Sequence, residues 1–258
     1  MEDSKGNNPI GKLNQSNYYS NNKYMSYSQF KGFEECEAKE MARIKGEYKE
    51  PENKAYLMGG YVDAYFSGES KKFANKHPEI YGKNGLKADF VQCDKIIKSI
   101  EEDYFFHSFY KGEAQVIETG EIAGVPFKGK FDFLTDVRIV DMKLMRNIED
   151  VWVDGIGKVP FWKAYGYDIQ AAIYQNLHLQ NTGCRLPYYL AVATKEDITG
   201  KHIFLFNQKT LDSALAEVRS KAPRFQAIKE GFLEPRECGH CDWYRQSHKM
   251  SESDVMKI

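Results

Sequence analysis

The sequence has almost no net charge, because its 36 lysine and arginine residues nearly balance its 37 aspartate and glutamate residues. A strongly basic chain would have pointed to a protein that coats nucleic acid, so any contact with a polyanion must come from a local patch. The balance is compatible with an enzyme whose carboxylates hold a metal ion and offset its basic side chains.

The sequence also lacks long apolar runs. Residues 1–15 are polar, without the apolar core of a signal peptide, and no later stretch has the length of a membrane span. The 5 cysteines are an odd number at irregular spacing. We therefore expect a cytoplasmic protein with no membrane partner, whose thiols are mostly reduced.

Several catalytic motifs are missing as well. The chain contains neither the G-x-x-x-x-G-K-[ST] loop of nucleoside triphosphatases nor the G-x-S-x-G turn of serine hydrolases. Its 6 histidines are scattered along the chain. These absences argue against a nucleotide-driven enzyme, a serine hydrolase and a histidine-based hydrolase.

The chain does contain enough apolar residues for a packed core, since 42% of its 258 residues are hydrophobic and 14% are aromatic. This length suits one α/β domain of generous size or two small ones. Residues 1–24 are rich in Asn, Ser, Gly and Lys and show no apolar period. This composition predicts a disordered tail ahead of a folded domain over residues 25–258.

Apolar spacing divides the folded part into helices, then strands, then a helix, two strands and a closing helix. We expect helices over residues 26–44, 54–66, 90–107, 161–180 and 207–229. We expect strands over residues 114–119, 127–134, 138–144, 186–194 and 202–206, the first three in an antiparallel meander. Residues 67–89 and 147–160 are predicted to be irregular. This order indicates a mixed α/β fold with one central mixed sheet flanked by helices.

Chemistry-bearing side chains gather on the second and third predicted strands. Strand side chains alternate between faces, so Asp141 and Lys143 share one face while Met142 points to the other. A turn near Asp136 could bring Asp132, on the preceding strand, beside Asp141. Converging carboxylates repel each other unless a cation lies between them, and Mg²⁺ prefers oxygen ligands. The two aspartates and the Met142 carbonyl thus form a candidate metal site, whereas the plainer interpretation is a solvated ion pair at a strand edge.

A second pair of polar side chains lies on the helix predicted over residues 161–180. Gln170 and Tyr174 are four positions apart and therefore share one helical face. An amide and a phenol on one face could hold a phosphate or a base edge. An ordinary amphipathic helix shows the same spacing, so this pair carries weight only together with the strand residues.

Taken together, these residues resemble the PD-(D/E)xK nuclease superfamily, and more closely its RecB-like and exonuclease VIII (RecE-like) branch from phages and prophages. The shared pattern is an Asp on one strand, Asp/Glu-x-Lys on the next and Gln-x-x-x-Tyr on the following helix, here Asp132, Asp141-Met142-Lys143 and Gln170 with Tyr174. Residues 25–31 and 57–64 are also similar, so the likeness spans about residues 24–245. It implies a restriction-endonuclease-like core.

The resemblance also implies roles for individual residues. It implies cleavage of DNA phosphodiester bonds with Mg²⁺ or Mn²⁺ bound by Asp132 and Asp141, while Lys143 orients or deprotonates the attacking water. Asp63 is a further candidate ligand, because related enzymes often carry a histidine there. The DNA strand would be positioned by Gln170 and Tyr174 and by basic residues that flank the motif, namely Lys128, Lys130, Arg146 and Lys163. For each of these four, solvated surface is the alternative. Glu113 corresponds loosely to an acidic position in such enzymes.

The cysteines allow a further comparison. Some members of the superfamily hold an iron–sulfur cluster with one early and three late cysteines. Here Cys36 could be the early ligand, but only Cys238 and Cys241 follow late in the chain, so we do not expect the cluster. Cys184 would have to come from elsewhere. A zinc site from Cys238, Cys241 and His240 or His248 is one alternative to structural or free thiols.

For the whole protein, the resemblance implies a homo-oligomeric exonuclease that resects double-stranded DNA ends from 5′ to 3′ in phage-type recombination. The single strand that remains would be bound by a partner protein that anneals single strands. One alternative is a single-strand or structure-specific nuclease of the same superfamily, in repair or defence. Another is a non-catalytic DNA-binding protein on a nuclease fold. Degenerate copies lose the Asp or the Lys, whereas this chain keeps Asp141 and Lys143. Cleavage polarity and the choice between DNA and RNA stay open.

Overall fold

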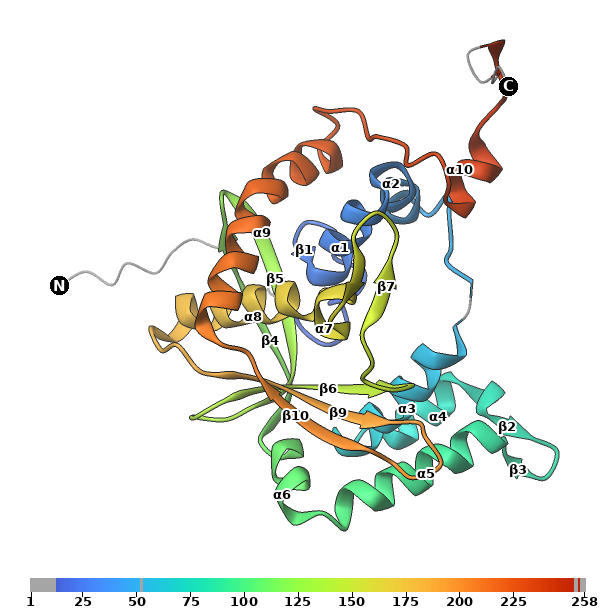
Figure 1. The fold of residues 1–258 in the computed structure, drawn as a ribbon, viewed down its shortest axis with the longest axis vertical. Coiled ribbons are helices and arrows are strands. Elements are labelled where there is room, and N and C mark those ends of the chain that lie inside the picture. The colour runs from blue at the N-terminus through green and yellow to red at the C-terminus, as the bar shows by residue number, and fades with distance from the viewer. Residues whose placement is uncertain (1–12, 52, 253–254, 256–258) are drawn as a thin grey trace.

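A six-stranded mixed sheet forms the centre of the computed structural model, which describes residues 13–51, 53–252 and 255 (Figure 1). Its strands are β1 (Met25–Ser26), β4 (Glu113–Ile122), β5 (Val125–Leu134), β6 (Ile139–Met145), β9 (Tyr188–Thr194) and β10 (Lys201–Leu205). The order is β1-β5-β6-β9-β10, with β4 paired to β5. Pairings β4–β5, β5–β6 and β9–β10 are antiparallel, and β1–β5 and β6–β9 are parallel. The predicted mixed sheet and its antiparallel meander are therefore confirmed.

Helices cover both faces of this sheet (Figure 1). One layer, here the upper layer, contains α1 (Tyr27–Glu35), α2 (Glu37–Lys45), α8 (Tyr167–Thr182) and α9 (Gln208–Lys229). The other, the lower layer, contains α3 (Lys54–Phe66), α4 (Ser70–Lys76), α5 (Ala88–Glu101) and α6 (Tyr104–His107). Each layer buries its own apolar cluster against the sheet, with Phe30, Phe127 and Ile173 above and Val62, Ile96 and Val140 below. No helix among the described residues is both long and apolar enough to cross a membrane.

Two long predicted helices are each split in the structure. The helix expected over residues 26–44 breaks at Cys36, whose backbone is extended, and thus becomes α1 and α2. The helix expected over residues 161–180 becomes α7 (Phe161–Ala164) and α8, because Gly166 between them adopts a left-handed backbone. Apolar spacing alone does not reveal such breaks, since the periodicity resumes on the far side of each.

Short elements fill the segments that we expected to be irregular. Residues 67–89 contain α4, a 3₁₀ turn (Pro78–Ile80) and the hairpin of β2 (Tyr81–Gly82) with β3 (Gly85–Leu86). Residues 147–160 contain the hairpin of β7 (Val151–Val153) with β8 (Gly157–Val159). The helix predicted over residues 90–107 is α5 and α6, followed by a second 3₁₀ turn (Ser108–Tyr110), and a last helix, α10 (Asp242–Ser247), was not predicted. Elements this short show too few turns or alternations for a period to be recognised.

The N-terminal segment is packed further upstream than composition predicted. Residues 13–24 are described and lie against the sheet, with Tyr18 and Tyr24 buried. The Lys128 ammonium donates a hydrogen bond to the Asn21 carbonyl oxygen at 2.6 Å. The Gln15 side-chain amide donates to the Gln115 carbonyl oxygen at 2.7 Å. The prediction of disorder is therefore wrong for residues 13–24, and its remainder, residues 1–12, lies outside the described residues.

The two edges of β5 are paired differently, and this difference positions the site. Along one edge β5 pairs with β4 over almost its full length. On the other edge it pairs with β1 at Phe127 and Lys128 and with β6 at Phe133 and Leu134. Between these two partners, residues 129–131 of β5 are registered with β4 alone, and Asp132 has no registered partner among the described strands. We call the point where β5 and β6 separate, next to Asp132, the fork.

Candidate active site

The face of β6 that carries the predicted site is the one that points to the upper layer. Val140 and Met142 belong to the lower apolar cluster, and Leu144 packs against it. Alternation therefore places Asp141 and Lys143 on the opposite face, toward α8. This arrangement of the strand, half in the core and half at the site, is what the sequence predicted.

Asp132 and Asp141 face each other across the fork. The pair Phe133 and Val140 is registered, so the next opposed positions of the two antiparallel strands are Asp132 and Asp141. The Met142 backbone N–H donates to Asp132 Oδ2 at 2.8 Å. A carboxylate thus takes a hydrogen bond that a strand backbone would otherwise accept, and the two strands can part here without an unsatisfied N–H.

Asp141 is held in one orientation by two neighbours. The residue is only 2% exposed, and the Gln170 amide donates to its Oδ1 at 2.6 Å. Its other oxygen, Oδ2, forms an ion pair with the Lys143 ammonium and, among the described residues, accepts no hydrogen bond of ordinary geometry. The Lys143 ammonium also lies 5.4 Å from the centre of the Tyr167 ring. Gln170 thus orients the Asp141 carboxylate. Oδ2, which is paired with the Lys143 ammonium, keeps the capacity to bind a metal cation.

Asp63 reaches the fork from the lower layer, where it lies on α3. Both of its carboxylate oxygens accept from the Gln115 amide, at 3.0 Å and 3.3 Å. Gln115 is buried and adopts a left-handed backbone, with φ of 56°. This conformation is rare for a residue other than glycine and is found at functional sites. It is the residue that the sequence analysis missed, because a lone glutamine within a strand carries no recognisable pattern.

The left-handed Gln115 coincides with a change of face along β4 and β5. Ala114 pairs with Phe133 and both belong to the lower side of the sheet, whereas Val116 pairs with Phe131 and both belong to the upper side. Two residues that are two positions apart would share a face in a regular strand. The strands therefore turn over at the row that contains Gln115 and Asp132, and this turn brings the lower layer within reach of the site.

The charges at the fork are strongly coupled. Burial, then Asp141 and then Asp63 raise the pKa of Asp132 well above its usual value. Burial also raises the pKa of Asp63, while Lys130 and Lys143 act to lower it. Burial would lower the pKa of Lys143, but Asp141 and Asp132 outweigh it and raise that pKa, so the amine remains an ammonium.

This arrangement fits a divalent cation. Three carboxylates, one buried and two partly buried, that lie close enough to perturb one another are unfavourable without positive charge between them. An all-oxygen donor set suits Mg²⁺ or Mn²⁺. The ligand oxygens of the three aspartates are not all within 4.8 Å of one another in the described structure. Gln115 contacts the Asp63 carboxylate, and Gln170 and Lys143 contact the Asp141 carboxylate.

Tyr174 lies behind the site and braces β5. Its ring is buried and packs on Phe131 with a centroid distance of 4.9 Å. A Cβ atom on Gly129 would come within 3.1 Å of that ring, so glycine is what lets the helix approach the strand. The sequence placed Gln170 and Tyr174 on one helical face, and both do point to the sheet. The phenol, however, interacts with Tyr18 and with the backbone of Lys130.

The four basic residues proposed to contact phosphate have different surroundings. Lys128 is 3% exposed, and its ammonium donates to the Tyr18 and Asn21 carbonyl oxygens. The direct phosphate contact expected for Lys128 is therefore wrong, because the side chain fastens the N-terminal segment instead. The Lys163 ammonium is 2.9 Å from Asp168 and 3.5 Å from Glu217, so two carboxylates already neutralise it.

Lys130 and Arg146 remain as candidate phosphate contacts. The Lys130 ammonium donates to the Tyr19 hydroxyl at 2.9 Å and lies 4.9 Å from the centre of the Tyr19 ring. Arg146 is exposed directly after β6. Glu113, the other acidic position considered from the sequence, is exposed at the start of β4. Lys130 and Arg146 therefore stay candidates for contact with phosphate.

The sheet with its fork, and an Asp, an Asp-x-Lys and a Gln converging there, define a nuclease of the PD-(D/E)xK class. The chain belongs to the family described as "PDDEXK-like domain of unknown function (DUF3799)", whose model matches residues 26–247. It is similar to a crystal structure from Eubacterium rectale titled "Putative exonuclease", with 38% sequence identity and a TM-score of 0.89. That match covers 93% of this chain and 95% of the other. No curated protein matches the chain.

Gln115 gives a first testable prediction. Replacing Gln115 with Leu removes the amide that holds the Asp63 carboxylate, so the metal concentration for half-maximal cleavage should rise about 10- to 100-fold, as for other residues that orient a ligand. The measurement is a Mg²⁺ titration of cleavage rate. Gln246→Leu, on an exposed position of α10, is the matched control and should leave the titration unchanged. An unchanged titration for Gln115→Leu would show that Asp63 needs no orientation.

Proposed function

We propose that this chain is a metal-dependent deoxyribonuclease that degrades double-stranded DNA from its ends. One observation supports the chemistry above all: the buried Asp141 carboxylate is held by Gln170 and Lys143 directly across the fork from Asp132. A non-catalytic DNA-binding protein has no use for an ammonium beside buried carboxylates, whose burial costs free energy. The similarity to a structure titled as an exonuclease supports the choice of end-directed cleavage.

Each residue at the fork has a role in this proposal. Asp132 and Asp141, with Asp63 as a third ligand, would hold Mg²⁺ or Mn²⁺, which when bound stabilises charge on the phosphate and activates water. Gln170 fixes the orientation of the Asp141 carboxylate. Lys143, kept charged by the aspartates, orients the attacking water by hydrogen bonding. Water adds to phosphorus and the bond to the leaving sugar oxygen breaks, which leaves a phosphate on one fragment and a hydroxyl on the other.

The proposed substrate and partners extend this chemistry. Lys130 and Arg146 would contact the phosphates of the strand that enters the fork. Resection from 5′ to 3′ would leave a single strand for an annealing protein, as the resemblance to exonuclease VIII implies. A closed homo-oligomer would keep the enzyme on one DNA end, and sedimentation of the purified chain measures that state directly.

Removal of the metal tests the proposal. After dialysis against EDTA the protein should leave end-labelled linear duplex intact, and added Mg²⁺ or Mn²⁺ should restore its degradation to mononucleotides. A covalently closed circle of the same sequence should survive, and a 5′ label should be released before a 3′ label. Cleavage that persists in EDTA would overturn the metal mechanism. Nicking of the circle, or faster loss of a single strand than of duplex, would replace the end-directed function with the structure-specific or single-strand alternative.

A further inference from the structure

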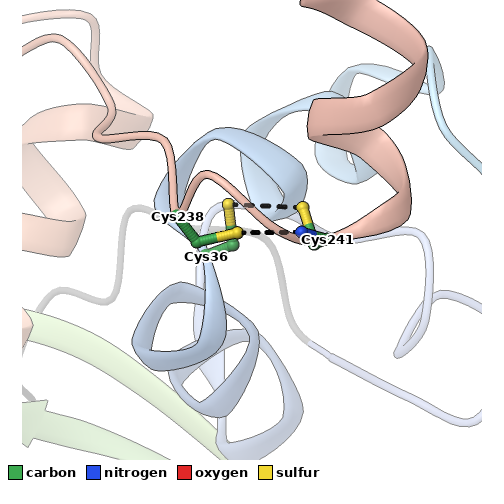
Figure 2. A group of neighbouring side chains, drawn as sticks. All are labelled: Cys36, Cys238 and Cys241. Atoms are coloured by element: carbon green, nitrogen blue, oxygen red, sulfur yellow. Dashed lines mark hydrogen bonds between the residues drawn. The ribbon is translucent and has the colours of Figure 1, made fainter. Parts of the chain in front are cut away.

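A second group of metal-binding side chains lies away from the fork, at the contact between the N-terminal helices and the C-terminal segment. The sulfurs of Cys36, Cys238 and Cys241 all lie within 4.8 Å of one another, and in Figure 2 the three side chains point to a common place. Cys36 is the residue between α1 and α2, and Cys241 lies 205 positions later, directly before α10. Among the described residues, these three form the only such group of His, Cys, Asp or Glu.

The spacing of the sulfurs fits a single ion. Sulfur ligands about 2.3 Å from a tetrahedral zinc ion lie about 3.8 Å from one another. The Cys36 and Cys241 sulfurs are 3.8 Å apart. All five cysteines of the chain are free, so no disulfide accounts for this approach. An iron–sulfur cluster places several irons and sulfides between its ligand thiolates and needs them farther apart.

The local backbone presents two of these thiols to one point. Gly239 is left-handed, with φ of 79°, and lets the chain turn between Cys238 and Cys241. The Cys241 N–H donates to the Cys238 sulfur at 3.3 Å, and the Tyr244 N–H donates to the Cys241 sulfur at 3.4 Å. Donors directed at sulfur favour the thiolate, which is the form that binds metal.

We propose that Cys36, Cys238 and Cys241 bind one zinc ion as thiolates, at a site that is independent of the nuclease function proposed above. Three thiolates are soft ligands and select zinc over the hard cations of the fork. His240 does not join them, since its Nδ1 lies 2.8 Å from the Cys238 carbonyl oxygen and no histidine nitrogen is within the sulfur group. Among the described residues no His, Asp or Glu joins the three sulfurs, so we assign the fourth position to water, and each thiol releases its proton to solvent on binding.

The ion would link the junction of α1 and α2, at Cys36, to the C-terminal segment that contains Cys238 and Cys241. Cys36 precedes Glu37, whose carboxylate accepts from Arg224 at 2.7 Å and 2.8 Å and from the Arg236 backbone N–H at 2.8 Å. The Ala38 N–H in turn donates to the Arg236 carbonyl oxygen at 3.1 Å. These contacts hold residues 236–241 on the start of α2, and Figure 1 shows α10 beside α2. Because an ion that binds only the folded state stabilises it, the site should raise the unfolding temperature.

Metal analysis of the full-length protein, purified without chelator and without a polyhistidine tag, tests the site. We expect one zinc per chain, and Co²⁺ in its place should give the near-ultraviolet charge-transfer band of a cobalt thiolate. Cys36→Ser and Cys238→Ser should each weaken zinc binding at least about 100-fold, in line with the free energy that structural zinc ligands supply. Cys184→Ser, at an exposed cysteine outside the group, is the matched control and should bind zinc as the wild type does.

A second measurement on the wild-type protein guards against variants that fail to fold. Bound zinc should protect three of the five thiols from a thiol reagent, and removal of zinc should expose them and lower the unfolding temperature. Three results would each overturn the proposal. They are the absence of bound zinc after dialysis against micromolar zinc, a visible absorbance band that depends on bound iron, and a disulfide between Cys36 and Cys241. If the wild-type protein bound zinc but did not cleave DNA, the proposed function would be contradicted and the zinc site would still be supported.

Discussion

Asp141→Asn should abolish the cleavage of duplex DNA without unfolding the protein. The substitution removes the charge that binds the metal and leaves the Lys143 ammonium without its ion-pair partner, while the side chain keeps its shape and can still meet the Gln170 amide. We expect kcat to fall at least about 10³-fold, which corresponds to about 4 kcal/mol of lost transition-state stabilisation. The measurement is single-turnover cleavage of an end-labelled duplex at saturating Mg²⁺.

Asp136→Asn is the matched control for this experiment. Asp136 is an exposed aspartate in the turn that joins β5 to β6, so the same chemical change occurs five residues away in sequence from Asp141. Its activity should stay within about twofold of wild type, as for most exposed substitutions. Retained cleavage by Asp141→Asn would remove this carboxylate from the mechanism, and an equal loss in both variants would show that the defect lies in folding.

Lys143→Met should give the second largest loss, and in a different kinetic parameter. Methionine preserves the apolar stem on β6 but removes the ammonium beside Asp141. We expect kcat to fall about 10²- to 10³-fold, the loss typical of a group that acts in the transition state, with little change in KM for DNA. Mg²⁺ affinity, measured by calorimetry, should be preserved or increased, because the aspartates lose a competing positive charge.

Lys158→Met, at an exposed position of the hairpin β7–β8, provides the control for Lys143→Met. The joint pattern of lost turnover and preserved metal binding separates a catalytic lysine from a structural one. If Lys143→Met cleaved DNA at the wild-type rate but unfolded at a lower temperature, the ion pair would be a stabilising contact on a strand, as the plainer interpretation of the sequence holds.

The parts of the site that could be predicted from the sequence are those that local periodicity decides. The common face of Asp141 and Lys143 follows from strand alternation, and the helix predicted over residues 54–66 is α3 in the structure. The common face of Gln170 and Tyr174 follows from helical spacing in the same way. The family resemblance then supplied the order of these elements, and the comparisons confirm the superfamily and the mixed α/β fold.

Features that depend on distant contacts could not be predicted. A lysine such as Lys128 is expected to be exposed. Its ammonium is instead buried, because it donates hydrogen bonds to backbone carbonyl oxygens of the N-terminal segment, more than 100 positions away in the sequence. Gln115 became significant only once α3 placed a carboxylate beside it. Cys36 separates two helices in the middle of an unbroken apolar pattern, and its side chain contacts Cys241, which lies more than 200 positions later in the sequence.

A sheet usually separates the helices on its two sides, but in this sheet the pairing between β5 and β6 stops at the fork and leaves a gap between the two strands. Asp63 reaches this gap from the lower layer and Gln170 from the upper layer, while Asp132 and Asp141 lie on the two strands that border it. Neither half of the molecule alone can therefore assemble the full set of side chains. A fragment that kept the sheet with only one of its helical coverings would be inactive even if it folded.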